Sequence, residues 1–207
     1  MAARSYHLSK RAKSAQATRK MILEAALELF MESGYHGVTV VQVAARAGVS
    51  LNAIYGSIGG KPQLLIALND EAAQDPTIEI VMDAVVLARS GREVIAAFAR
   101  GTRNLLERHE WLLGQLYDSA SADPRIHESL TLARGRFARR LSEAVARLGE
   151  LRSLSSGVTL HRAEDVMWFH FGFPPWQQLR TAGWDWSEAE VWLLDQATHA
   201  LLRASSR

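Results

Sequence analysis

Polar side chains at the starts of two short predicted helices are suited to hydrogen bonding with a nucleic acid. Thr39, at a helix start, can donate its hydroxyl and backbone N–H groups to a phosphate. Asn52 has the amide that pairs with adenine through two hydrogen bonds, and Leu51 or Ala53 could contact a thymine methyl group. Gln42 could bond a base edge or close a capping box with Thr39, and the capping box is slightly favoured.

The sequence lacks the residue sets that catalysis or metal binding would need. It contains seven His and no Cys, so disulfides, thiolate metal sites and cysteine nucleophiles are excluded. None of the histidines stands in an HExxH or other ligand spacing, and the glycines at 56–60 do not form a phosphate-cradling GxxxxGKS/T loop. We therefore predict no catalytic residue, no metal site and no cofactor, and the chain is not expected to be an enzyme.

Two short helices joined by a tight turn are predicted between Thr39 and Lys61. Thr39 can cap the first helix, Gly48 can end it in a left-handed turn, and Ser50 can cap the second helix, Leu51–Ser57. The second helix is too short to be stable alone and must pack on its partner. A helix-turn-helix of this kind presents its second helix to the major groove of DNA.

The stretch from Thr18 to Leu68 carries an ordered set of motifs. These are Ile22, Ala25-Ala26, Leu29-Phe30, Gly34-Tyr35, Thr39, Val43-Ala44, Ala47-Gly48-Val49-Ser50, Ile54-Tyr55, Lys61 and Leu64-Leu65. With them, about a quarter of the chain resembles the DNA-binding domain of the tetracycline-repressor (TetR) family of bacterial transcription regulators. The sequence departs from the family pattern at Leu51, where the family usually has a polar or basic residue, and near Gly56, where it usually has a large polar one.

The resemblance implies a set of DNA contacts. Tyr55 and Lys61 match the family's phosphate-binding tyrosine and lysine, and the start of the first helix touches phosphates in the family. The full predicted DNA-contact set is Thr18, Arg19, Lys20, Thr39, Gln42, Ser50, Leu51, Asn52, Ala53, Tyr55 and Lys61. For Tyr55 the alternative is a half-buried aromatic ring with its hydroxyl in solvent.

Charge is unevenly distributed along the 207 residues, although the net charge is only +2. Residues 1–61 hold eight Lys or Arg against three Glu, whereas residues 62–207 hold sixteen against nineteen acidic residues. A basic end fits a nucleic-acid contact surface or a solvated tail, and the adjoining helix-turn-helix favours DNA. No apolar run approaches the roughly 20 residues of a membrane span, and residues 1–20 lack the apolar core of a signal peptide. We therefore expect a cytoplasmic protein with no membrane partner.

Helix signals continue to the end of the chain without a strand pattern, so the sequence predicts an all-α fold. We divide it into a flexible basic arm (1–17), a three-helix helix-turn-helix DNA-binding domain (18–65) and a helical bundle for ligand binding and dimerisation (66–207). The predicted helices of the bundle are 76–89, 90–107, 109–119, 124–149, 162–181 and 187–204. Capping boxes at Ser90–Glu93 and Ser187–Glu190 start two of them, and Pro174-Pro175 should break or kink the helix over 162–181.

Aromatic residues concentrate in the C-terminal half, where an apolar pocket between helices could hold a small effector. The predicted pocket residues are Trp111, Tyr117, Trp168, Phe171 and Trp176, although most aromatics of this half would simply form core or interface. The last two helices carry apolar faces, which in the TetR family pair with their two-fold mates as a four-helix bundle. The predicted dimer residues are Val166, Phe169, Phe173, Val191, Leu194, Thr198, Leu201 and Leu202, with burial inside one subunit as the alternative.

Together these features predict a homodimeric, ligand-responsive transcription regulator. Its partners would be palindromic double-stranded DNA, read by recognition helices about 34–36 Å apart, and a small, largely apolar effector that releases the DNA. A repressor is the first expectation. The alternatives are an activator, an effector-independent regulator, or a helical small-molecule binder with altered DNA recognition, which Leu51 and Gly56 keep open.

Overall fold

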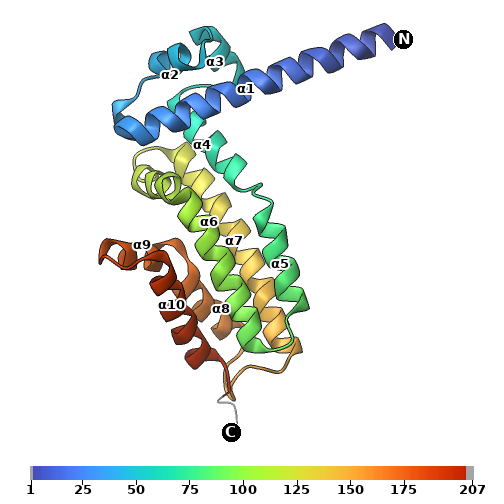
Figure 1. The fold of residues 1–207 in the computed structure, drawn as a ribbon, viewed down its shortest axis with the longest axis vertical. Helices are drawn as coiled ribbons and strands as arrows, with labels where there is room; N and C mark the ends of the chain where they lie inside the picture. The colour runs from blue at the N-terminus through green and yellow to red at the C-terminus, as the bar shows by residue number, and fades with distance from the viewer. Residues whose placement is uncertain (1, 204–207) are drawn as a thin grey trace. The chain divides into compact units, whose positions relative to one another are not determined.

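Ten α-helices, α1 to α10, account for most of residues 2–203, which are the residues that the computed structural model describes (Figure 1). Side chains are described for residues 13–203. Within this range the structure has no β-strand and only one isolated β-bridge, between Leu154 and Leu202. The all-α prediction is therefore confirmed. The chain divides into two compact units. Unit 1 comprises Met1–Ala73 and Gly114–Leu130, and unit 2 comprises Gln74–Leu113 and Thr131–Arg207.

Unit 1 contains α1 (Ala2–Gly37), α2 (Val40–Ala47), α3 (Leu51–Ser57) and α4 (Lys61–Ala72). In Figure 1, α2 and α3 lie beside the C-terminal half of α1. Their shared core consists of fully or almost fully buried apolar side chains, among them Ile22, Leu23, Ala26, Phe30, Val43, Ile54, Leu64 and Leu65. Arg46 of α2 adds ion pairs to Glu28 (3.2 Å) and Glu32 (2.9 Å) of α1.

The first helix begins earlier than the sequence predicted. It begins at Ala2, so residues 2–17 are helical where the sequence predicted an arm before a helix start at Thr18. The reason is composition: Ala, Arg, Lys and Gln favour helix even without an apolar stripe. The flexibility of residues 1–17 in solution stays a prediction. At the other end, Gly34 (φ 73°) interrupts the regular helix, and helical structure continues to Gly37.

Unit 2 is built on α5 (Thr77–Leu87) and most of α6 (Gly91–Ser119) and α7 (Pro124–Glu150). The predicted helices 90–107 and 109–119 form the single helix α6, with a kink at His109 (φ −116°, ψ 19°) where the break was expected. Helices α6 and α7 each continue into unit 1, which therefore includes a segment that the sequence assigned to the C-terminal bundle.

The last three helices are α8 (Leu160–Phe171), α9 (Phe173–Thr181) and α10 (Trp186–Leu201), and α8 packs along α10. The break at Gly172 confirms that the proline pair ends the helix predicted over 162–181. The predicted capping box at Ser187–Glu190 is wrong. Asp185 instead caps α10 by accepting a hydrogen bond from the Glu188 N–H (2.8 Å), because Asp is a preferred N-cap.

Helices α5 and α6 approach closely at Gly101. A Cβ atom at this position would lie 2.3 Å from a side-chain carbon of Val81 on α5. Only glycine allows this separation, since real Cβ contacts essentially never come so close. Eight of the eleven residues of α5 are apolar, yet only Val85 is buried, so α5 is held to the bundle by few fully buried side chains.

Candidate functional site

The start of α2 contains the first predicted contact residues. Thr39 accepts a hydrogen bond from the Gln42 N–H (3.3 Å), and the Gln42 amide oxygen accepts one from the Thr39 N–H (2.8 Å). This capping box confirms the favoured interpretation of Gln42. The Gln42 oxygen also accepts from the Thr39 hydroxyl (2.9 Å). Both side chains are exposed, and Gln42 keeps its amide N–H groups for another acceptor.

Helix α3 presents a surface of mixed polarity. The Ser50 hydroxyl accepts from the Ala53 N–H (3.1 Å), so Ser50 is the N-cap that the sequence predicted. Ile54 is fully buried and holds the seven-residue helix against unit 1. On the outer side Asn52 is exposed, Leu51 is 37% exposed and Tyr55 is 55% exposed. The exposure of Tyr55 is compatible with both interpretations, so its contact with DNA stays a prediction.

Two basic residues of the predicted set already have partners in unit 1. The Lys61 ammonium donates to the His36 carbonyl (3.1 Å) and lies 4.6 Å from the centre of the Tyr35 ring. Burial lowers the pKa of Lys61. Arg19 donates to the Ser57 carbonyl (3.3 Å), at the last residue of α3. A cation at a helix C-terminus is favourable, so Arg19 also orients α3.

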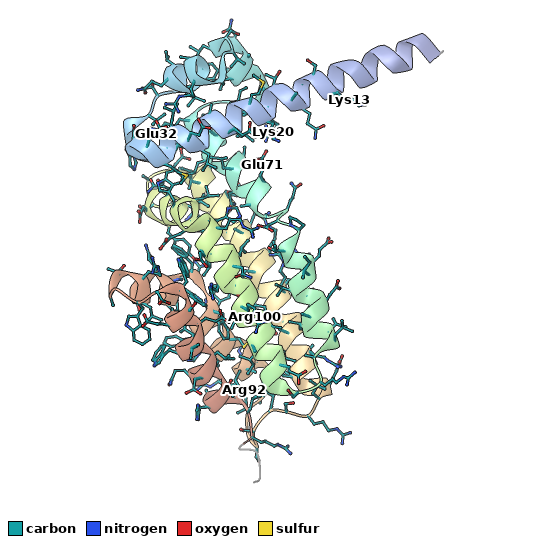
Figure 2. All side chains as sticks on the ribbon, viewed as in Figure 1. Lys13, Lys20, Glu32, Glu71, Arg92 and Arg100 are labelled. Atoms are coloured by element: carbon teal, nitrogen blue, oxygen red, sulfur yellow. The ribbon has the colours of Figure 1, made fainter. Side chains whose placement is uncertain are left out.

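The remaining predicted residues of α1, Thr18 and Lys20, flank Arg19 near the middle of the helix. Lys13 and Lys20 project from the helix in Figure 2. Lys20 forms an exposed ion pair with Glu24 at 3.5 Å, which is a weak interaction in water. Thr18 donates its hydroxyl to the Ser14 carbonyl (3.0 Å). All predicted contact residues therefore belong to unit 1.

Residues 22–68 match the sequence model of the family described as bacterial regulatory proteins, tetR family. This segment belongs to the TetR family. Over 87 residues the chain is 37% identical to the HTH-type transcriptional regulator SrpR of Pseudomonas putida and, separately, 37% identical to the regulator TtgW of the same species. Each match covers 38% of this chain, and the matches cover 41% of SrpR and 65% of TtgW. Both relatives are named as regulators, in agreement with the prediction that the chain is not an enzyme.

Most of the chain shares the fold of a solved structure, that of SmeT, the repressor of the Stenotrophomonas maltophilia multidrug efflux pump SmeDEF. The TM-score is 0.69 at 20% identity, covering 92% of this chain and 93% of SmeT. SmeT has also been solved in complex with triclosan, and that structure gives a TM-score of 0.68. The fold likeness extends over both units and therefore beyond the family match at residues 22–68.

Unit 2 contains a small hollow between α5, α6 and α7. Its volume is about 30 Å³. The lining residues are Thr77, Ile78, Val81, Met82, Phe98, Gly101, Thr102, Leu105, Phe137 and Arg140. The hollow is apolar apart from two threonines and one arginine.

None of the predicted pocket residues lines this hollow. Trp168 and Phe171 lie one layer behind it: the Trp168 ring is 5.5 Å from Phe137, and the Phe171 ring is 6.0 Å from Phe98. Trp176 is fully buried against Trp186, with 5.8 Å between ring centres. Trp111 is half-buried in unit 2, whereas Tyr117 belongs to unit 1 and so is not part of the bundle core.

Arg140 is not among the residues predicted from the sequence, although its position on α7 could have indicated it. Phe137, Leu141 and Ala144 form an inward-facing stripe on α7, with Leu141 and Ala144 buried. Arg140 occupies the position three residues after Phe137, where such a stripe would carry an apolar side chain. A charged residue within a core stripe is unusual and points to a partner or a site.

The predicted dimer residues divide into two groups. Phe169 and Val191 are 71% and 67% exposed, and Val166, Leu194, Thr198 and Leu202 are half-buried. Phe173 and Leu201 are buried within the chain, so for these two the alternative of burial inside one subunit holds. Their burial follows from the break at Gly172, which changes the direction of the chain, and from the packing of α10 on α8.

Among the described residues, no helix is long and apolar enough to cross a membrane, and no three His, Asp or Glu side chains are grouped as a metal site.

Proposed function

We propose that this chain is a homodimeric transcriptional repressor that binds palindromic operator DNA and releases it when a small, largely apolar effector binds in unit 2. The observation that carries the proposal is the surface of α3. Ile54 anchors the helix from inside, while Asn52 and Tyr55 remain exposed for a DNA groove and its phosphates. The family relationship of residues 22–68 supports the same assignment.

The contacts of unit 1 suggest a role for each basic residue. Lys61 donates one of its three N–H groups to His36, and the other two are available to a phosphate. Arg19 fixes the C-terminal end of α3 through Ser57 and leaves the rest of its guanidinium for the DNA backbone. The Thr39 N–H is donated to Gln42, so a second phosphate would bind the backbone N–H groups that follow Thr39 at the start of α2.

A two-fold dimer would give two recognition helices. The exposed side chains of Phe169 and Val191 lie on α8 and α10, which pack along one another. Two copies of this apolar surface can pair face to face in an isologous contact, as closed dimers require. In such a dimer an effector acts by favouring a conformation that fits DNA poorly, with a coupling of about 1–3 kcal/mol.

A second candidate function rests on Leu51. This side chain is 37% exposed at the position where base-reading residues are expected, and an aliphatic residue reads only methyl groups. The alternative is a ligand-binding protein of the same fold whose DNA recognition is altered.

Selection of genome fragments with the purified protein, at two salt concentrations, separates these candidates. We expect a palindrome to be enriched and its affinity to fall steeply with salt, because each phosphate contact contributes about −0.9 to the slope of log K against log salt. On the selected site, Asn52→Ala should cost about 1–3 kcal/mol. Lys61→Ala should flatten the salt slope by about one contact.

Gln177→Ala, which truncates an exposed amide on α9, is the control and should bind as the wild type does. If folded protein enriches no sequence at either salt concentration, the regulatory proposal is wrong and the ligand-binding alternative takes its place.

A further inference from the structure

Among the described residues, Arg140 is the only charged residue that lines the hollow of unit 2. Arg140 belongs to α7, while the aliphatic lining residues Ile78, Val81 and Met82 belong to α5. The hollow therefore combines an apolar lining with one cationic residue. This combination recognises a molecule with the complementary polarity.

The part of the chain that the structure describes provides no counterion for the guanidinium of Arg140. Among the described residues, no carboxylate lies within ion-pairing distance of it and no hydrogen bond engages it. Burial lowers the pKa of Arg140, and the nearby charges of Arg136 and Arg139 lower it further, against a weaker opposing effect of Glu143. A half-buried cation among like charges is costly to the fold, and binding of an anion would relieve that cost.

We propose that the hollow binds the carboxylate of an alkyl carboxylic acid through Arg140, with the alkyl chain between α5 and α7. This inference rests on the proposed function, because it specifies the effector that unit 2 would bind. A planar guanidinium matches a carboxylate through two parallel hydrogen bonds, which makes arginine the suited cation for this head group. The narrow hollow and its flexible aliphatic wall favour an unbranched chain over a bulky ring.

The volume of about 30 Å³ is smaller than such a chain, so the site must open to accept it. Helix α5 is the wall best able to move, because Val85 is its only fully buried residue. After an outward shift of α5, the half-buried side chains of Ile78, Val81 and Met82 would contact the ligand instead of one another. The alkyl chain would then replace these contacts.

Calorimetric titration with octanoate, octanol and octylamine tests the charge requirement, since the three compounds share the chain length and differ in the head group. At neutral pH we expect octanoate to bind at least tenfold more tightly than octanol, and octylamine to bind weakest. Arg140→Gln should abolish the preference for octanoate. Arg139→Gln is the matched control, because it removes the same charge from an exposed position one residue away that does not line the hollow.

The Arg140→Gln variant should also unfold at the same or a higher temperature than the wild type, because the substitution removes an unpaired half-buried charge. A lower unfolding temperature would show that Arg140 stabilises the fold and would overturn the proposal. A Leu105→Phe variant, which adds volume to the hollow, should weaken binding of octanoate and octanol alike.

The proposal is wrong if the three compounds bind equally, if none of them binds, or if Arg139→Gln weakens octanoate as much as Arg140→Gln does. None of these titrations contains DNA. A failure here therefore leaves the operator selection to decide the regulatory function independently.

Discussion

The Asp75 carboxylate of unit 2 accepts several hydrogen bonds, and its replacement gives a quantitative test of the structure. The side chain is 4% exposed and accepts hydrogen bonds from the Thr77 N–H (2.9 Å), the Thr77 hydroxyl (2.6 Å) and Arg108. His109, at the kink of α6, lies 3.4 Å away. Asp75→Asn keeps the shape of the side chain but removes the charge to which these donors point.

Burial by itself raises the pKa of Asp75, but the hydrogen bonds from Thr77, Arg108 and His109 outweigh it and lower the pKa from 3.8 to about 2. The shift corresponds to a stabilisation of about 2 kcal/mol at neutral pH. Because the folded-state pKa is the lower one, this stabilisation is present above the unfolded-state pKa of 3.8 and is lost as the pH falls towards 2. Near pH 3 about 1 kcal/mol should remain.

Tryptophan emission reports the unfolding of unit 2, which contains Asp75, and so measures this stabilisation. All six tryptophans belong to unit 2, and all four tyrosines belong to unit 1. In urea titrations followed by tryptophan emission, we expect Asp75→Asn to lose about 2 kcal/mol of unfolding free energy at neutral pH, and the difference from wild type to shrink below pH 4.

Asp123→Asn provides the control for Asp75→Asn. Asp123 also precedes a proline and has its pKa lowered to about 2, chiefly by its hydrogen bond with Arg125, but it belongs to unit 1 and its partner is exposed. Its replacement should leave the tryptophan transition unchanged. A loss for Asp75→Asn that is the same at neutral pH and at pH 3, or no loss at all, would refute the assigned charge contacts.

Two further variants test the packing of α5 and the dimer surface. Gly101→Ala should destabilise unit 2 by about 1–3 kcal/mol, because the added Cβ would overlap Val81, and a second change, Val81→Ala, should restore part of the loss in urea titrations. Phe169→Glu should convert a dimer to monomers in analytical ultracentrifugation while helicity stays unchanged, because this side chain is 71% exposed in the single chain. Leu160→Glu, exposed on the other side of α8, should leave the dimer intact, and dimers of Phe169→Glu at wild-type affinity would contradict the assigned surface.

Much of the candidate site in unit 1 could be predicted because its elements are held by contacts over three or four residues. The pairs Thr39–Gln42 and Ser50–Ala53 form as expected, and Gly48 adopts the left-handed conformation. What the sequence did not reveal is that Lys61 and Arg19 are engaged with His36 and Ser57, 25 and 38 residues away. Residue type suggested a phosphate partner for each, while the fold supplied a carbonyl as well.

The predicted pocket residues do not line the hollow of unit 2, for a related reason. Aromatic type marks a side chain for the interior, but it does not tell which interior side chains border an empty space. Trp168 and Phe171 pack behind Phe137 and Phe98, and the aliphatic residues of α5 form the wall instead. The position of α5 depends on its close approach at Gly101, which no local pattern predicts.

By itself, the sequence determined the helical fold class, the helix-turn-helix with its caps, and the break before Pro174, because propensity, capping and proline geometry act within a few residues. The tertiary structure alone decided which apolar side chains are covered. It buried Leu201 and left Phe169 exposed, it paired Asn69 with Ser129 across 60 residues, and it placed Arg140 in the lining of the hollow. The physical reason is that burial and cavity shape arise from segments that are distant in sequence and meet only in the folded chain.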